Sequence, residues 1–386
     1  MPFHPLGARM RYWLMGLALI GIFLITANPL TYTQAITKGF SDVIDYMAIA
    51  HSANLDSLYT LSQQHALHRI ERWPVHFLMG QLAFFMQVDV WALERVAVVI
   101  SMVCMLALIN LLRITQWQKI AIVALLLFSP YALRQYYAVP GMLVDCLFYL
   151  AITGMAVAMA NKNTKAVIVA MCLAILLRQT GLVLIPIFWI YCWYLAQQRN
   201  LLIGGSLFAI GSFFLVKGLA SWVFAPVTSD YVTMHTLGIF YWLAAKPQWH
   251  EWIDFMGRYG LMLFTLAPLA ILVQRLRRED WLWIAFFFWL HAQPLLAGPH
   301  VSGSNVDRLA IYGLPFLAML LGHGISQKRW VLIFVILVFT ESLLPNFSVL
   351  NTLPYPRALF VLMVLSVCLA SLGIWWHQRY RIQAHV

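Results

Sequence analysis

The chain has 386 residues, of which 62% are hydrophobic and only 10% are charged, and its mean hydropathy is +0.78. A soluble domain carries roughly 25% charged residues, so this composition excludes a soluble globular protein and predicts an all-α polytopic membrane protein. The net charge of +11 does not indicate nucleic-acid binding, because the basic residues form small clusters between apolar segments. All five cysteines fall inside apolar segments, so no disulfide framework is predicted.

The first predicted helix spans residues 13–30 and follows Arg9 and Arg11. Its apolar run is longer than that of a typical cleaved signal peptide, so we expect an uncleaved membrane helix. Basic residues before a first span favour a cytoplasmic N-terminus.

A long outer loop is predicted next, over residues 31–90, and it opens with two acids in "SDVIDYMAIA". Ser41 is placed to cap a helix there. Asp42 and Asp45 share a helical face, with Tyr46 one turn after Asp42. Carboxylates near a membrane surface suit a general base, whereas acids in a first helical turn also simply favour the helix dipole. Residue type alone leaves both interpretations open.

Residues 74–88, "PVHFLMGQLAFFMQV", are apolar enough to count as a further span. Counting them would place every later basic cluster on the side opposite to the N-terminus, against the usual cytoplasmic bias. We therefore predict a helix that lies in the outer interface, within the first extracytoplasmic loop.

The remaining apolar segments complete a single transmembrane domain over residues 1–386, with about twelve helices and both termini cytoplasmic. A second large extracytoplasmic loop is predicted at 223–258. The later spans are predicted at residues 91–112, 120–138, 140–160, 166–178, 181–197, 201–222, 259–274, 281–297, 309–325, 330–344 and 357–376.

Several arginines stand at the predicted outer boundary, against the general charge bias. Arginine forms bidentate hydrogen bonds with phosphate oxygens, so such a set is suited to hold a lipid-linked phosphate. Each one alone is better explained by snorkelling to headgroups or by pairing with a nearby acid. As a set, with Arg178 and Arg308 foremost, the arginines indicate a phosphate-binding site at least as strongly as they indicate snorkelling or pairing. The set comprises Arg69, Arg72, Arg95, Arg134, Arg178, Arg308 and Arg357.

The second outer loop is rich in tryptophan and tyrosine beside His250 and Glu251. Aromatic faces next to polar groups suit sugar binding, although an interfacial aromatic belt explains most of these residues better. His250 and Asp254 share a helical face but form a weak metal signal, so no metal site is predicted. Asp145 and Glu341 lie within predicted spans, where acids are costly and often functional.

Taken in order, these segments resemble the GT-C class of integral-membrane glycosyltransferases, such as dolichyl-phosphate-mannose mannosyltransferases and aminoarabinose transferases. "SDVIDYMAIA" is similar to the acidic start of their first outer loop, and Pro74 and Arg95 fit the interfacial helix and the next span. Two departures are Val43, where a second acid usually follows, and a single proline where a pair is usual. Further similar segments are "LFSPYALRQYYAVPGMLVDCLFY", "LLRQTGLVLIPIFW" and "DRLAIYGLPFL".

The resemblance implies an inverting hexosyl- or pentosyltransferase that acts at the extracytoplasmic face of the cell inner (plasma) membrane. It would move a sugar from a polyprenyl-phosphate donor to a lipid-linked or cell-envelope glycan acceptor. Asp42, with Asp45, would be the catalytic base. The phosphate would be bound by Arg178, Arg308 and Arg95, and the candidate substrate-binding residues are Tyr46, Arg134, Asp145, His250 and Glu251. No cofactor is implied, a divalent cation stays open, and the expected partners are the donor, the acceptor and membrane lipids.

Two other functions stay open on the sequence. A polysaccharide polymerase or ligase also combines outer arginines and acids, but its key loops usually come later in the chain. A lipid or glycan transporter would place polar residues near the bilayer midplane, often in repeated halves. Here the charge is concentrated at the outer boundary and no repeat is evident, which ranks transport lower.

Overall fold

A computed structural model describes residues 5–40, 42–64, 72–130, 133–195, 199–224, 247–302, 310–343 and 356–383. Over these ranges the chain forms helices and no strand. Six helical segments are long and apolar enough to cross a membrane by length and composition, which confirms the predicted all-α membrane class. They are Arg9–Thr26, Val90–Asn110, Pro140–Ala160, Arg199–Val223, Trp249–Leu272 and Ala358–Tyr380. Four shorter apolar segments are Gln116–Phe128, Thr164–Leu177, Gln179–Tyr194 and Ile311–His323.

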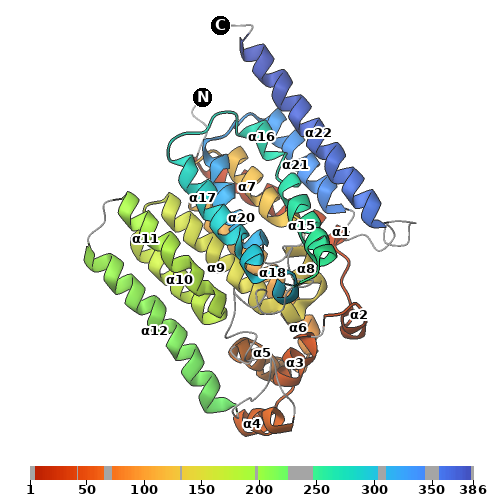
Figure 1. Cartoon of the computed structure of the whole chain (residues 1–386), viewed down its shortest axis with the longest axis vertical. Helices are drawn as coiled ribbons and strands as arrows, with labels where there is room; N and C mark the ends of the chain where they lie inside the picture. Colours follow the sequence, from red (N-terminus) through yellow and green to blue (C-terminus); the bar gives the residue numbers. More distant parts are fainter. Residues whose placement is uncertain are drawn as a thin grey trace. The chain divides into compact units, whose positions relative to one another are not determined.

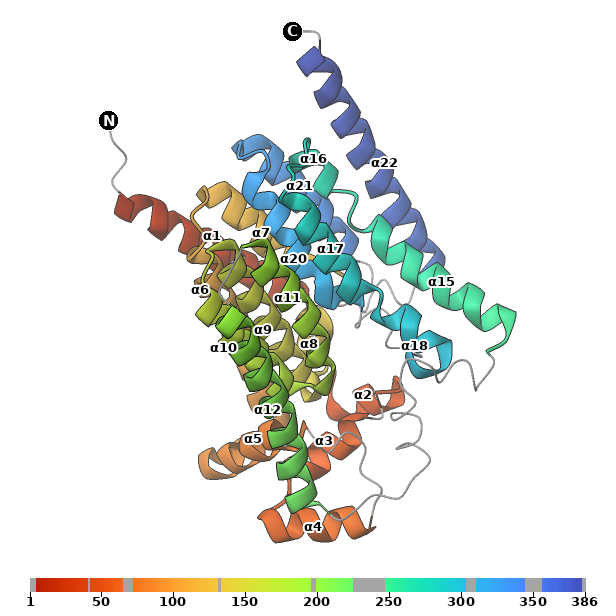
Figure 2. The same ribbon diagram turned by 60° about the vertical axis from the view of Figure 1, so that its left-hand side comes forward.

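The contacts divide the chain into two compact units, which Figures 1 and 2 show within the whole chain. Unit 1 comprises Met1–Asn28, Met105–Gln135 and Ile239–Val386, and unit 2 comprises Pro29–Cys104 and Tyr136–Gly238. The two predicted features of greatest interest, the acids of the first outer loop and Arg178, both belong to unit 2.

Unit 2 contains a set of neighbouring helices with several short helices at one end. Four of these helices follow one another in the chain, and the second of them, α10 (Thr164–Leu177), contacts the other three. These three are α9 (Leu143–Ala160), α11 (Leu184–Tyr194) and α12 (Arg199–Val223). The short helices α3 (Asp42–Ala50), α4 (Leu55–Gln64) and α5 (Trp73–Met86) lie at one end of this set (Figures 1 and 2). The predicted first outer loop is therefore helical over much of its length, and α5 agrees with the helix predicted at 74–88.

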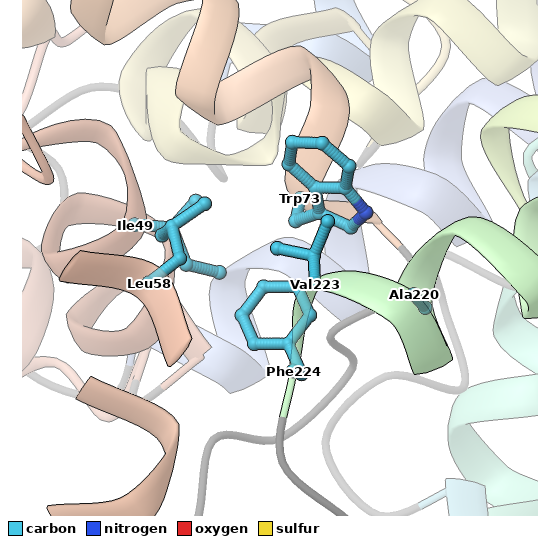
Figure 3. Packing of buried hydrophobic residues seen from close by; sticks show 6 residues of the cluster. All are labelled: Ile49, Leu58, Trp73, Ala220, Val223 and Phe224. Carbon is cyan, nitrogen blue, oxygen red and sulfur yellow. The ribbon is translucent and has the colours of Figure 1, made fainter. Parts of the chain in front are cut away.

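An apolar cluster joins these short helices to the end of α12 (Figure 3). The Trp73 ring meets the Phe224 ring edge-on, with centroids 6.1 Å apart. Burying large side chains of this kind stabilises a fold by about 1.5–3 kcal/mol each. The cluster therefore fixes the first turn of α5, just after Arg72. Its members are Ile49, Leu58, Trp73, Ala220, Val223 and Phe224.

Helices α3 and α5 approach each other closely at Gly80. A Cβ atom built on Gly80 would overlap the backbone carbonyl of Ala50, at the end of α3. Only glycine leaves room for this backbone-to-backbone contact. Pro74 in the first turn of α5 suits a helix start, because that turn has no intrahelical use for the missing N–H.

Unit 1 is built around α7 (Gln116–Phe128), which packs against α1 (Pro5–Thr26) and α21 (Lys328–Leu343). Thr115 caps α7 through a reciprocal capping box with Gln118. The Gln118 Nε2 group also donates to the carbonyls of Gly322 and Gly324, at 3.1 and 2.9 Å. The rest of the described unit consists of α15 (Trp249–Phe264), α16 (Leu269–Leu272), α17 (Asp280–His291), α18 (Gln293–Ser302), α20 (Leu314–Ala318), α22 (Pro356–Gln383) and short 3₁₀ turns.

Several predicted spans are not single helices, and two of them have a break at a proline or glycine. The span predicted at 120–138 ends at Phe128, and a separate short helix, α8, covers Leu133–Ala138. Pro130 lies in the break, and a proline cannot donate the next backbone hydrogen bond. The span predicted at 281–297 divides into α17 and α18, and α18 is itself interrupted at Gly298, whose φ is 71°. Most of the predicted loop at 223–258 lies outside the described residues.

The contact at Gly80 generates a prediction on stability. Gly80→Ala should lower the stability of unit 2 by about 1–3 kcal/mol, because the new methyl group overpacks the α3–α5 contact. Gly211→Ala in α12 is the matched control, because its Cβ would meet nothing within 4 Å. Thermal unfolding of both variants, followed by tryptophan fluorescence, checks this. Equal melting temperatures for the two variants would contradict the close approach.

Candidate functional site

The acids that open the first outer loop lie in the first turn of α3. Asp42 and Asp45 are half-buried, whereas Tyr46 is almost fully buried. At helical spacing the two acids lie on the same face as Tyr46. The capping role predicted for Ser41 falls on a residue outside the described ranges.

Arg72, directly before α5, contacts both α3 and α9. Its Nη1 group donates a hydrogen bond of 2.6 Å to the hydroxyl of Tyr46, and its guanidinium lies 6.0 Å from the Tyr46 ring centroid. The same Nη1 lies 3.7 Å from Oδ1 of Asp145, in the first turn of α9. Arg72 therefore joins the short helices of the first outer loop to α9.

Arg178 pairs with the same Asp145 carboxylate, and it follows Asp145 in the chain whereas Arg72 precedes it. It stands at the C-terminal end of α10, where the backbone turns extended, and its Nη1 donates to Oδ1 of Asp145. The Arg178 guanidinium also lies 5.5 Å from the ring centroid of Phe148. Two guanidinium groups thus share the Asp145 carboxylate, and both side chains are at most 11% exposed. These three groups together carry a surplus of one positive charge.

A buried histidine–glutamate pair lies beneath Tyr46. The His76 ring in α5 stacks on the Tyr46 ring, with centroids 4.3 Å apart and planes within 13°. Its Nδ1 lies 2.8 Å from Oε1 of Glu94, in α6 (Val90–Asn110), and both side chains are 0% exposed. The second polar atom of each group, Nε2 of His76 and Oε2 of Glu94, has no hydrogen-bond partner among the described residues.

The contacts form one continuous series through unit 2, which we call the Tyr46–Arg178 network. It is defined by Glu94, His76, Tyr46, Arg72, Asp145 and Arg178. Its members come from α3, α5, α6, α9 and the end of α10. Such an arrangement can offer guanidinium groups to an anion beside the carboxylates of α3.

The other predicted site residues have different surroundings. The Arg95 guanidinium donates to the backbone carbonyls of Leu30 and Tyr137, at 2.8 and 3.3 Å, rather than to the network. Arg134 is buried in unit 1, where it donates to the Ser342 carbonyl and, at 2.9 Å, to the Thr26 hydroxyl. Arg95 therefore bridges two segments of unit 2, and Arg134 bridges two segments of unit 1.

The candidates in the second outer loop lie at the start of α15. His250 is exposed, and Glu251 caps the helix by accepting a 2.7 Å hydrogen bond from the Gln248 backbone N–H. Arg308 lies outside the described residues. Within the described ranges, no group of three or more metal-ligating side chains is found.

Three members of the network were absent from the residues predicted as a site. Arg72 is one of the outer arginines, but the resemblance implies Arg95 as a phosphate ligand and not Arg72. His76 and Glu94 were hidden in apolar segments. Their position inside apolar segments identifies them, because burying a histidine and an acid there costs free energy unless the two side chains are paired.

The buried pair generates a prediction that separates pairing from packing. His76→Phe or Glu94→Leu alone should lower stability by about 3–5 kcal/mol, because each leaves a buried polar partner unpaired. The double variant should recover much of that loss, since both polar groups are then gone. Thermal unfolding of the three purified variants measures this double-mutant cycle. Losses that simply add would show that the two side chains do not act as a pair.

Comparisons with known proteins return no match: no protein-family model, no curated protein and no solved structure is significantly similar to this chain.

Proposed function

We propose that the chain is an inverting glycosyltransferase that moves a sugar from a polyprenyl-phosphate donor to a lipid-linked or cell-envelope glycan acceptor. One observation carries this proposal. The half-buried acids of α3 lie on the helix face of Tyr46, and Tyr46 leads through Arg72 and Asp145 to Arg178. A candidate base on α3 and a network with two candidate phosphate-binding arginines thus both lie in unit 2, and Tyr46 belongs to that network and to α3.

The chemistry requires few groups. The acceptor hydroxyl oxygen attacks the anomeric carbon while the bond from that carbon to the phosphate oxygen breaks. The hydroxyl proton passes to the Asp42 carboxylate, which acts as the general base. Attack from the face opposite to the leaving group inverts the anomeric centre. Polyprenyl phosphate is a good leaving group, so no general acid is needed.

The arginine pair suits the charge that develops during this reaction. The phosphodiester of the donor carries one negative charge, whereas the departing phosphate monoester gains a second. Cations that meet the growing charge stabilise the transition state more than the ground state, which raises kcat. Arg72 and Arg178 bring two guanidinium groups to the same carboxylate in unit 2, so they can serve this role. In this proposal Arg72 takes the phosphate-binding role that the resemblance implies for Arg95.

The location follows from the same proposal. About twelve helices would cross the cell inner membrane, with the two termini in the cytoplasm. The short helices α3 and α5 would then lie at the extracytoplasmic face, where a lipid-linked donor and a membrane glycan meet. Several exposed apolar side chains of α5, including Phe84 and Phe85 at 84% and 85% exposure, suit contact with lipid there.

The central test of the base is Asp42→Asn. Purified protein in vesicles would be offered polyprenyl-phosphate sugars and membrane glycolipid acceptors, and sugar transfer would be measured. The variant should lose about 10²–10⁴-fold in kcat, because the amide cannot accept the hydroxyl proton. Asp254→Asn is the control, since this exposed acid pairs with Arg258 on α15.

The outcomes of that assay also separate the other functions. Full transfer by Asp42→Asn would contradict the assignment of the base. Joining of preassembled lipid-diphosphate glycans would favour a polymerase or ligase. Movement of a glycolipid across the vesicle membrane without sugar transfer would favour a transporter.

The arginines predict a different kinetic pattern. Arg72→Lys and Arg178→Lys keep the positive charge but lose the fork that binds two phosphate oxygens. Each variant should lower kcat by about 10²-fold, with a smaller change in the KM for the donor, since the interaction is strongest in the transition state. Arg258→Lys, on the exposed side of α15, should leave both constants unchanged. A rise in KM alone would mean that the arginines bind the ground state and the transition state equally, which would contradict their role in stabilising the departing phosphate.

A further inference from the structure

The face of α3 opposite to Asp42 and Tyr46 borders a pocket of about 320 Å³. Ile44, Met47 and Ala48 form its apolar floor, and His51 stands one turn after Met47. At helical spacing these residues lie on the side of α3 away from the two acids. The pocket therefore belongs to unit 2 but not to the Tyr46–Arg178 network.

Two aromatic residues form one wall of the pocket. The Trp91 ring is 7% exposed, and its Nε1–H donates a 2.9 Å hydrogen bond to the Leu30 carbonyl, which fixes the orientation of the ring. The Tyr32 ring meets it edge-on, with centroids 5.8 Å apart. Tyrosine and tryptophan combine a large apolar surface with a polar tip, so this wall suits a ligand with an apolar face and polar edges.

Besides the Tyr32 hydroxyl, which can donate or accept, the pocket has two polar side chains that offer hydrogen-bond acceptors. Oδ2 of Asp89 accepts from the Ala92 backbone N–H at 2.9 Å, so Oδ1 is left to accept from a ligand. Nδ1 of His51 lies 2.7 Å from the Met47 carbonyl, which can only accept. Nδ1 of the neutral ring therefore carries the proton, and Nε2 is left as an acceptor. Two acceptors select a ligand that donates, and the Asp89 carboxylate repels anions.

We propose that this pocket binds a neutral sugar ring of the acceptor glycan. The apolar face of the ring would lie on the floor and the Trp91 wall, while its hydroxyl groups would donate to Asp89 and His51. A helix with its side chains is about 10 Å across, so this ring is a unit remote from the reacting hydroxyl on the other face of α3. The assignment of this sugar to the acceptor glycan rests on the proposed function. The binding of a neutral sugar in the pocket does not depend on it.

Saturation-transfer NMR on the full-length protein in nanodiscs tests the pocket directly. The probes are glucose, galactose, mannose, N-acetylglucosamine and arabinose, with glucuronate and inorganic phosphate as anionic probes. At least one neutral sugar should bind saturably, and both anions should bind at least about tenfold more weakly. Asp89→Asn should weaken the neutral sugar about tenfold or more. Asparagine can still cap α6, so the fold should be kept.

Two further variants keep this test decisive. Ala48→Phe fills the floor and should abolish sugar binding, whereas Gly211→Ala on α12 should not change it. Asp42→Asn should bind the sugar normally even though its kcat for sugar transfer is strongly lowered, which separates this pocket from the reacting face. The proposal is overturned if no neutral sugar binds, if Ala48→Phe binds as well as the unchanged protein, or if only lipid signals arise from the pocket. Retained transfer by Asp42→Asn would overturn the base and leave the pocket intact.

Discussion

Asp145 connects two parts of the chain that the sequence keeps far apart. Its carboxylate lies near Arg72, which precedes α5, and pairs with Arg178, which ends α10. A buried carboxylate without a partner is strongly destabilising, and so is a buried guanidinium. The position of Arg72 relative to α9 and the end of α10 therefore depends on keeping all three groups together. The same dependence holds Arg72 against Tyr46 of α3, the helix that carries Asp42 and Asp45, and links it through Asp145 to Arg178.

The apolar contacts and the polar network support each other. The Trp73 cluster fixes the start of α5 against α12, and the Gly80 contact brings α3 and α5 together along their length. Between these two contacts, the Tyr46 ring stacks on His76, whose Nδ1 faces Glu94. The Tyr46 hydroxyl thus has little freedom to move away from Arg72. In the proposed reaction, this rigidity would hold the arginine in place before the phosphate charge develops. The opposite face of α3 is left to border the proposed sugar pocket.

The sequence predicted the membrane class and several helices well, because long apolar runs carry that information directly. It also predicted that α3 would carry both acids and that Asp145, Tyr46 and Arg178 belong among the candidate site residues. It did not predict the Arg72–Asp145–Arg178 arrangement, because the sharing of one carboxylate is a tertiary contact without a local pattern. Arg95 and Arg72 look alike in the sequence, and only the backbone carbonyls of Leu30 and Tyr137 distinguish the surroundings of Arg95. Pro130 indicates a break after Phe128, but the continuous hydrophobicity of residues 120–138 favours a single helix.

In the proposed reaction, Arg72 and Arg178 hold the donor phosphate near α3. A cryo-electron microscopy structure in nanodiscs that contain a polyprenyl-phosphate sugar tests it most directly. We expect phosphate density within hydrogen-bond distance of both guanidinium groups, with the anomeric carbon directed towards Asp42. Phosphate density bound elsewhere, with both arginines still closed on Asp145, would contradict it.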